Sequence, residues 1–143
     1  MRLEKLKSEV WTCCHCSMCT ESVNDESGWY KTCPVYRQLR FEDASARGHN
    51  TIALYLLEGS LKYSKELADC IFKCTTCHAC EEICKPMGNM MASIGGSSLK
   101  TMVPPIVNAL GVELEPVHSV AIMKAMRADC VDLGLDPEPI KKL

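Results

Sequence analysis

The order of apolar and polar residues predicts helices in four stretches of this 143-residue chain. Near the start, Leu3, Leu6 and Val10 recur three and four residues apart, which places them on one face of a short helix. Similar spacing runs through residues 49–60 and 64–74, and a last helix is predicted over residues 119–134.

Capping residues frame the longer predicted helices. Asp43, Ser45, Ser64 and Ser119 stand where side-chain oxygens can accept from the free N–H groups of a first helical turn. Gly59 and Gly134 are the expected stops, because glycine readily adopts the backbone conformation that ends a helix.

Strand signals are nearly absent. Residues 20–32 are polar and rich in turn formers, so they predict a loop. Glycines and prolines interrupt any helix between residues 87 and 117. The pattern therefore predicts an all-α fold with cysteine-rich loops at the ends of helices.

Charge excludes some classes of partner. The chain carries 16 basic and 18 acidic side chains, and its formal charge of −2 gives no argument for binding nucleic acid or an acidic membrane surface. The charged N-terminus lacks the apolar core of a signal peptide, and no apolar run is long enough to span a bilayer. We therefore expect a cytoplasmic protein without a membrane span, for which peripheral association with a membrane complex stays open.

The 11 cysteines indicate metal binding. Thiols stay reduced in the cytosol, and an odd number fits a fully paired disulfide scaffold badly. Two runs each hold three cysteines separated by two residues, and each run is followed by a fourth cysteine close to a proline. The spacing C-x2-C-x2-C-x3-C-P is the bacterial ferredoxin signature of a [4Fe–4S] cluster. In the first run a longer loop delays the fourth cysteine.

The triple spacing suits the shape of a cubane cluster. Three cysteines wind a tight loop around one side and reach three iron corners, while the loop N–H groups point toward cluster sulfur. The fourth corner faces away from that loop, and in two-cluster ferredoxins the fourth cysteine of each run binds the other cluster. The expected ligands of two [4Fe–4S] clusters are Cys13, Cys16, Cys19 and Cys84 for cluster 1, and Cys33, Cys74, Cys77 and Cys80 for cluster 2.

Structural zinc sites are the alternative chemistry. Zinc takes four thiolates from two C-x2-C knuckles, which would leave the third cysteine of each run without a role. One departure from the ferredoxin signature stands in the second run, where Lys85 separates Cys84 from Pro86.

The remaining candidates receive simpler interpretations. Cys14, Cys70 and Cys130 lie outside the ligand spacing, and we interpret them as small buried apolar residues. A substitute ligand or a redox-active thiol is the alternative for each. His15 and His78 each neighbour a ligand, but each cluster already has four cysteines, so both are expected beside a cluster or exposed rather than bound to it.

The motifs resemble those of a known group of proteins. The chain is similar to heterodisulfide reductase C, which is an iron–sulfur protein of the heterodisulfide reductase complex. It is also similar to the two-cluster N-terminal part of heterodisulfide reductase D and of the iron–sulfur subunits of glycolate and lactate oxidases. The resemblance rests on CCHCSMC, CPVYR, ARGHNTIALYLLEGSL and CTTCHACEEICKP.

The resemblance implies an α-helical ferredoxin fold with two domains. A two-cluster domain is expected over residues 1–90, and a C-terminal helical extension over residues 91–143 is expected to pack on it or on a partner subunit. The ligands carried over by position are the eight cysteines already named.

The function that the resemblance implies is electron relay within a larger oxidoreductase. Single electrons would pass from a flavin- or iron–sulfur-containing donor subunit, through both clusters, to a catalytic subunit that reduces disulfides. The iron–sulfur subunit of a FAD-linked glycolate or lactate oxidase is the alternative, and a zinc-stabilised interaction module is a further one. No catalytic residue is expected, because the chain has neither a dinucleotide fingerprint nor a nucleophile–base pair. The chain is therefore expected not to be catalytic alone.

Overall fold

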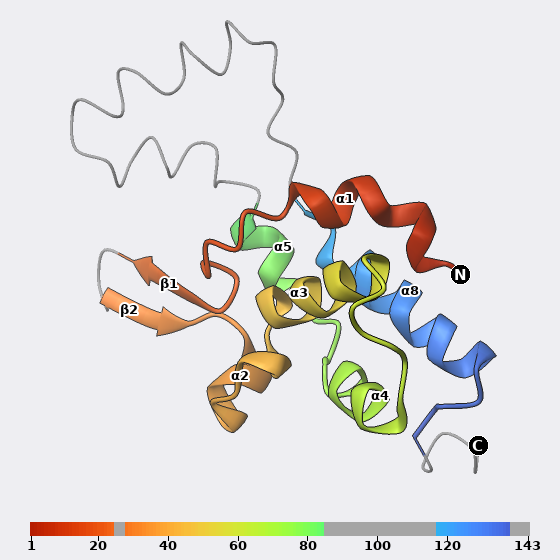
Figure 1. Cartoon of the computed structure of the whole chain (residues 1–143). Coiled ribbons are helices and arrows are strands. Elements are labelled where there is room, and N and C mark those ends of the chain that lie inside the picture. Colours follow the sequence, from red (N-terminus) through yellow and green to blue (C-terminus); the bar gives the residue numbers. More distant parts are fainter. Residues whose placement is uncertain (25–27, 85–116, 138–143) are drawn as a thin grey trace, which may run out of the picture.

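The computed structural model describes residues 1–24, 28–84 and 117–137 of the chain (Figure 1). In chain order the elements are η1 (Leu3–Leu6), α1 (Lys7–Thr12), β1 (Glu21–Asn24), β2 (Gly28–Lys31), α2 (Pro34–Leu39), η2 (Glu42–Ala44), α3 (Ala46–Leu57), α4 (Lys65–Phe72), α5 (Ala79–Cys84) and α8 (Ser119–Asp132). The described chain is mostly helical, as the apolar pattern predicts.

Local sequence sets the ends of α3 and α4. Ser45 Oγ accepts the N–H of Gly48 at 3.1 Å, and Ser64 Oγ accepts an N–H of the first turn of α4 at 3.2 Å. Gly59 and Gly134 follow α3 and α8 with φ of 76° and 70°, a left-handed conformation that favours glycine. The caps Ser45 and Ser64 and both glycine stops are confirmed. Asp43 lies within η2 and caps no helix, because the chain first makes a separate turn there.

The prediction that Ser119 caps the last helix is wrong. Ser119 is the first residue of α8, and the N-cap His118 makes no side-chain cap bond. Carboxylates from distant elements accept the free N–H groups instead: Glu9 binds the N–H of His118 and Glu81 that of Val120, both at 2.8 Å. Negative charge at a helix N-terminus is also favoured by the helix dipole.

Strands β1 and β2 form an antiparallel hairpin where the sequence predicts a loop. Glu21 pairs with Lys31 in register, and the N–H of Thr32 donates to the carbonyl of Thr20 at 3.0 Å just beyond the strands. Backbone hydrogen bonds and one ion pair between Lys31 and Glu21 hold the hairpin, so it needs little apolar surface and leaves a weak sequence signal. The hairpin folds residues 20–32 back on themselves, so Thr20 and Thr32 lie side by side at its base.

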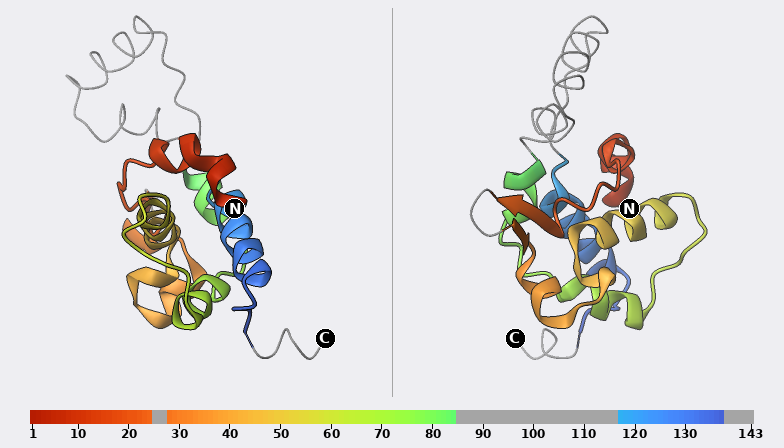
Figure 2. Two further views of the ribbon diagram at one scale, coloured as in Figure 1. Left: turned by 45° about the vertical axis from the view of Figure 1, so that its right-hand side comes forward. Right: turned by 90° about the vertical axis from the view of Figure 1, so that its left-hand side faces the viewer.

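A single buried core joins the helices of the described chain. Leu3, Ala53, Ile71 and Met126 come from η1, α3, α4 and α8 and are all fully buried in one apolar cluster. Helix α8 lies beside α3 and α4 (Figures 1 and 2). Buried apolar area of this kind is the main favourable term in folding.

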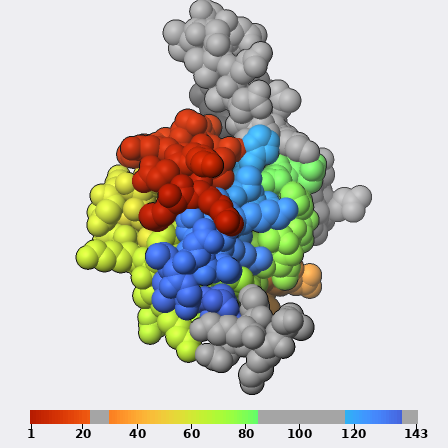
Figure 3. Space-filling model, turned by 90° about the vertical axis from the view of Figure 1, so that its right-hand side faces the viewer, coloured from red at the N-terminus to blue at the C-terminus, as the bar shows by residue number. Residues whose placement is uncertain are grey.

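The N-terminal segment is fastened to α8. Asp129 accepts the N–H groups of Arg2 at 2.6 Å and Leu3 at 3.1 Å, and the hydroxyl of Tyr63 at 3.2 Å. Figure 3 shows the first residues lying against α8. Helix α8, which belongs to the expected extension, thus shares the core with the earlier helices, whereas the expected boundary near residue 90 falls outside the described residues.

The described part of the chain contains no candidate membrane-spanning helix. None of its helices combines the length and the apolar character that crossing a bilayer requires.

Candidate metal centre

Two loops with one unusual backbone conformation carry the clustered cysteines. We name residues 13–19 the first cysteine loop and residues 74–80 the second cysteine loop. Both neighbours of the middle cysteine have positive φ in each loop: 53° at His15, 71° at Ser17, 52° at Thr76 and 64° at His78. A non-glycine residue in this conformation costs about 1–3 kcal/mol, so the surrounding structure must hold it there.

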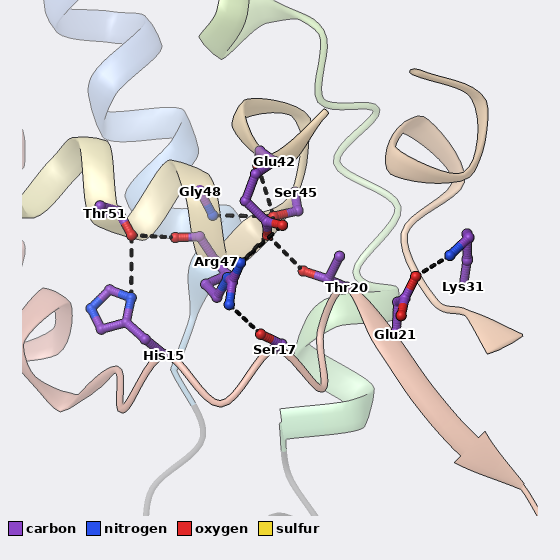
Figure 4. A network of polar contacts seen from close by, with 10 residues as sticks. All are labelled: His15, Ser17, Thr20, Glu21, Lys31, Glu42, Ser45, Arg47, Gly48 and Thr51. Atoms are coloured by element: carbon purple, nitrogen blue, oxygen red, sulfur yellow. Dashed lines mark hydrogen bonds and ion pairs between the residues drawn. The ribbon is translucent and has the colours of Figure 1, made fainter. Parts of the chain in front are cut away.

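Helix α3 holds the first cysteine loop through Arg47 (Figure 4). The guanidinium of Arg47 donates to the hydroxyl of Ser17 in the loop. The same group binds both carboxylate oxygens of Glu42, at 3.0 Å and 2.9 Å, and Thr20 donates to Glu42 at 3.4 Å. Because a guanidinium presents its donors in a fixed plane, Arg47 links the loop to η2 with a defined geometry.

His15 is held one turn further along the same helix. Its Nδ1 lies 3.2 Å from the hydroxyl of Thr51, which itself donates to the carbonyl of Arg47 at 2.9 Å (Figure 4). The hydroxyl has one proton, so Nδ1 of His15 is the donor in this contact. Both strained residues of the first loop are therefore fixed by side chains of α3.

Helix α8 holds the second cysteine loop. Arg127 donates to the carbonyl of Cys74 at 2.5 Å and twice to the carbonyl of Ile71, at 3.3 Å and 3.1 Å. Its guanidinium also lies 5.1 Å from the ring centre of Phe72. The carbonyl of Ile71 belongs to the last turn of α4, and that of Cys74 follows just after the helix. A cation there satisfies both carbonyls and complements the helix dipole.

Glu81 joins the second cysteine loop to the start of α8. One carboxylate oxygen lies 2.6 Å from Nδ1 of His78, and the other accepts the N–H of Val120. Burial opposes ionisation of this carboxyl, but the bonds from Val120 and His78 outweigh burial and lower the pKa of Glu81.

Cys33 lies against the second cysteine loop. Burial raises the pKa of the Cys33 thiol, and the neighbouring thiols of Cys74 and Cys77 raise it further, against the opposing effect of the Tyr36 N–H. Charges on these thiols influence one another less as they move apart, so the mutual effect places the three thiols in one neighbourhood. The hairpin and α2 therefore return the first run's fourth cysteine to the other run.

Cys84 lies against the first cysteine loop. Burial raises the pKa of Cys84, and Cys13 and Cys14 raise it further, while the N–H of Val117 lowers it. Cys84 in turn contributes to the raised pKa of Cys16, for which burial is the largest cause. Its neighbours Lys85 and Pro86 lie outside the described residues.

The two loops also influence each other electrostatically. Burial raises the pKa of Cys80 to about 12, with the thiol of Cys19 as the next contribution, and burial likewise raises the pKa of Cys19 to about 12. These thiols are protonated at neutral pH. Since the thiolate is the metal ligand, loading a metal here releases protons.

Backbone N–H groups point at three of the expected ligand sulfurs. Tyr36 donates to Cys33 at 3.5 Å, Thr76 to Cys74 at 3.3 Å and Val117 to Cys84 at 3.4 Å. Such donors stabilise negative charge on cluster ligands and tune the potential of a cluster. Thiol sulfurs in paired loops, with N–H groups aimed at them, are a donor set that fits iron–sulfur clusters.

The expected ligands differ in exposure. The middle cysteines Cys16 and Cys77 are exposed, and the other six are partly buried. Within residues 1–24, 28–84 and 117–137, no three histidine, cysteine or acidic side chains already form a group that could hold a single metal ion.

The three other cysteines have separate environments. Cys130 is fully buried in α8, which agrees with the interpretation as a small core residue. Cys70 is partly buried, where burial and a bond with Asp43 raise the pKa of its thiol. Cys14 is exposed, so its interpretation as a buried apolar residue is wrong. The cause is the tight turn of the first loop, which leaves Cys14 beside the ligands rather than in the core.

Comparison with protein families gives a match over more than half of the chain. The family model described as 4Fe-4S dicluster domain matches residues 9–88. This range contains both cysteine loops and all eight expected ligands, and it ends before α8. No curated protein and no solved structure gives a significant match.

Proposed function

Because this chain belongs to the family of 4Fe-4S dicluster domains, and is by that membership an electron-transfer iron–sulfur protein, we propose that it holds two [4Fe–4S] clusters and relays single electrons through them. Cluster 1 is held by Cys13, Cys16, Cys19 and Cys84, and cluster 2 by Cys33, Cys74, Cys77 and Cys80. When bound, each cluster accepts or gives up one electron at a time.

The placement of the two fourth cysteines is the observation that carries the proposal. Cys33 interacts with Cys74 and Cys77, and Cys84 interacts with Cys13 and Cys16. Two-cluster ferredoxins exchange their fourth ligands in this way. The matching backbone of the two loops adds support, because one conformation repeated at both sites suits one kind of group.

The protein's own residues position the ligands and set their electrostatics. Arg47 and Arg127 hold the two loops, and the N–H groups of Thr76 and Val117 stabilise charge on ligand sulfur. Partial burial lowers the local dielectric, which strengthens each of these interactions. The two loops are thus electrostatically suited to cysteine thiolates, which carry negative charge when they bind a metal.

We place this relay in a heterodisulfide-reductase-like complex. The motifs shared with the iron–sulfur subunits of that group support this setting. Electrons enter from a flavin- or iron–sulfur-containing subunit and leave toward a subunit that reduces disulfides. Four cysteines on each cluster leave no iron corner open to a substrate, so the reaction itself belongs to the partner.

Metal analysis tests the number and kind of clusters. Protein purified without oxygen is expected to contain about eight iron and eight acid-labile sulfide per chain. Stoichiometric zinc without sulfide would contradict the proposal, and about four iron would contradict the second cluster.

Substitution of the fourth cysteines tests the crossed ligands. The electron paramagnetic resonance spectrum of reduced Cys33→Ser should change as that of Cys77→Ser does, and Cys84→Ser should resemble Cys16→Ser. Cys70→Ser, one turn before the second loop, serves as the control and should keep both signals. The opposite pairing of spectra would show that each run binds its own fourth cysteine.

A further inference from the structure

A cationic pocket lies between the hairpin and α2. It has a volume of about 320 Å³ and is lined by Glu21, Tyr30, Lys31, Arg37 and Arg40. Of these five described lining residues, three are cations and one is an anion, whereas the chain as a whole has a formal charge of −2. Positive side chains therefore predominate in the described lining of the pocket, although the net charge of the chain is negative.

Two of the cationic side chains make no polar contact with the described residues. Lys31 is already engaged, because it forms an ion pair with Glu21 and lies 5.3 Å from the ring centre of Tyr36. Within the described part of the chain, the guanidinium groups of Arg37 and Arg40 have no ion-pair or hydrogen-bonding partner. Arg40 also ends α2 with φ of 56°, which carries its side chain past the last turn toward the pocket that it lines.

Exposed apolar side chains flank these arginines. Leu39 is 47 % exposed, and Phe41 is 69 % exposed, the largest exposure among the large apolar side chains of the described residues. Arginine and aromatic residues beside aliphatic ones are the composition of protein interfaces, where arginine and tyrosine dominate the binding energy. We call Tyr30, Lys31, Arg37, Leu39, Arg40 and Phe41 the α2 patch.

The α2 patch adjoins an expected ligand of cluster 2. Cys33 is the N-cap of α2, and its carbonyl accepts the N–H of Arg37 at 2.9 Å. Arg37 therefore stands one helical turn from the ligand, and Arg40 stands one turn beyond it. A protein seated on the patch would lie next to the cluster edge that Cys33 holds.

We propose that the α2 patch is the docking surface for an acidic redox protein that exchanges one electron with cluster 2. This inference rests on the proposed function. In the exchange the reduced cluster loses one electron and the partner gains it, with no proton moved and no bond formed or broken. The partner presents carboxylates to Arg37 and Arg40 and an apolar contact to Phe41.

The negative overall charge restricts where an acidic partner can bind on this protein. Two four-thiolate clusters with 2+ cores would add about −4, which brings the formal charge to about −6. An acidic partner is repelled by the molecule as a whole and attracted at the α2 patch. Such complementarity steers encounter to one orientation and suppresses others.

Small charged oxidants test the local charge beside cluster 2. The cluster-loaded full chain is reduced without oxygen and mixed with ferricyanide, an anion, or with hexaammineruthenium(III), a cation. The ionic strength is about 0.1 M, so charges beyond about 10 Å are screened. We expect Arg37→Glu/Arg40→Glu to slow oxidation by ferricyanide about threefold and to accelerate oxidation by the ruthenium complex about as much.

A variant with an equal change in net charge is the control. Lys62→Glu/Lys65→Glu alters two exposed lysines at the start of α4, away from the pocket. It should leave both rates close to those of the unaltered chain. Equal effects of the two double variants would show that only net charge matters and would overturn the inference.

A peptide probe separates a docked protein from a small bound anion. A peptide of twelve glutamates is expected to slow ferricyanide oxidation of the unaltered chain and to have no effect on Arg37→Gln/Arg40→Gln. Inorganic phosphate at the same total charge should not compete. Competition by phosphate as strong as by the peptide, or no competition by either, would overturn a protein-docking role.

Cluster content keeps the two proposals distinguishable. Iron, sulfide and visible absorbance are measured on every variant before mixing. If the unaltered chain lacks two clusters, the proposed function fails. If both clusters are present and the α2 variants behave as the control does, only the docking inference fails.

Discussion

Single side chains, or their absence, fix the distance between helices near the first cysteine loop. Gly48 in α3 faces η2 so closely that an added Cβ would lie 2.0 Å from the carbonyl oxygen of Glu42. The same part of α3 supplies Arg47, which holds Ser17 and Glu42. The glycine is therefore a condition for the contact between α3 and the loop.

Gly48→Ala is expected to destabilise the protein by about 1–3 kcal/mol, because the backbone of η2 must move to admit the methyl group. The urea midpoint of the cluster-loaded chain should fall, and iron should be lost earlier in the transition. Glu58→Ala, at the exposed end of the same helix, should change stability by less than about 0.5 kcal/mol. An unchanged midpoint in Gly48→Ala would mean that η2 yields freely.

His49 gives the folded state a pH dependence. It is 1 % exposed, and burial lowers its pKa from 6.5 to about 4, with Asp43 acting against burial and Arg127 acting with it. Between these two values the unfolded chain binds a proton that the folded chain does not. Stability therefore falls as the pH drops from about 6.5 toward about 4.

His49→Gln should make stability less dependent on pH. The contribution of His49 between pH 7 and pH 5 is on the order of 2 kcal/mol, and it disappears in the variant. Urea midpoints across this range provide the measurement. Parallel pH profiles for the two proteins would place the titration elsewhere.

Residue-scale prediction from sequence succeeded where the partner was local. Ser45 and Ser64 cap helices through bonds within their own first turns. The cap of α8 escaped prediction because its acceptors, Glu9 and Glu81, stand 109 and 39 positions from the N–H groups they bind. Arg47 and Arg127 were missed for the same reason, since each looks in sequence like an ordinary charge on a helix.

At the scale of elements, different supports hold two loops of the same shape. Helix α3 and η2 brace the first cysteine loop, whereas α8 and Glu81 brace the second. Helix α8 lies outside the residues that match the family model. Part of the support for the second loop therefore comes from outside the matched region.

Arg127→Met should loosen the second cysteine loop selectively. Loss of hydrogen bonds from a charged donor costs about 1.5–3 kcal/mol, and the carbonyls of Cys74 and Ile71 lose their partner. Release of iron to a chelator should be faster from cluster 2 than from cluster 1. Lys124→Met, exposed on the same helix, should release iron as the unaltered chain does; equal release from both clusters of Arg127→Met would contradict selective support.

The hairpin shows why one element could not be predicted from the sequence. Pairing of Glu21 with Lys31 and of Val23 with Trp29 lies within a stretch dominated by polar and turn-forming residues. Its stability comes from backbone pairing and a cross-strand ion pair, which leave little trace in an apolar pattern. The four helical stretches, by contrast, each present an apolar face that local spacing reveals.

At the scale of the whole molecule, the cysteine spacing alone predicted the family of iron–sulfur proteins. The spacing is a direct requirement of the cluster, so it survives in the sequence. The way in which α8 completes the core could not be predicted. The apolar face of a helix in the sequence predicts that the face is buried, but it does not identify the element that covers it. Here Leu3, Ala53 and Ile71 belong to the same buried cluster as Met126.

The isolated chain is expected to carry electrons without catalysing a reaction. The reduced, cluster-loaded protein should pass electrons to one-electron oxidants, yet show no multiple turnover with disulfides, hydroxy acids or quinones. The reason is coordination, because eight cysteines complete both clusters. Consumption of substrate beyond the electrons stored in the chain, in a preparation free of other subunits, would reveal an active site in this protein.

The bond between Asp129 and the N–H of Leu3 has a consequence for biosynthesis. These residues are 126 positions apart, so the ribosome completes η1 and α1 long before it adds the residue that fastens η1. Until α8 is made, Leu3 and its apolar neighbours lack the helix that covers them. Exposed apolar surface of this kind makes a partly made chain prone to aggregate.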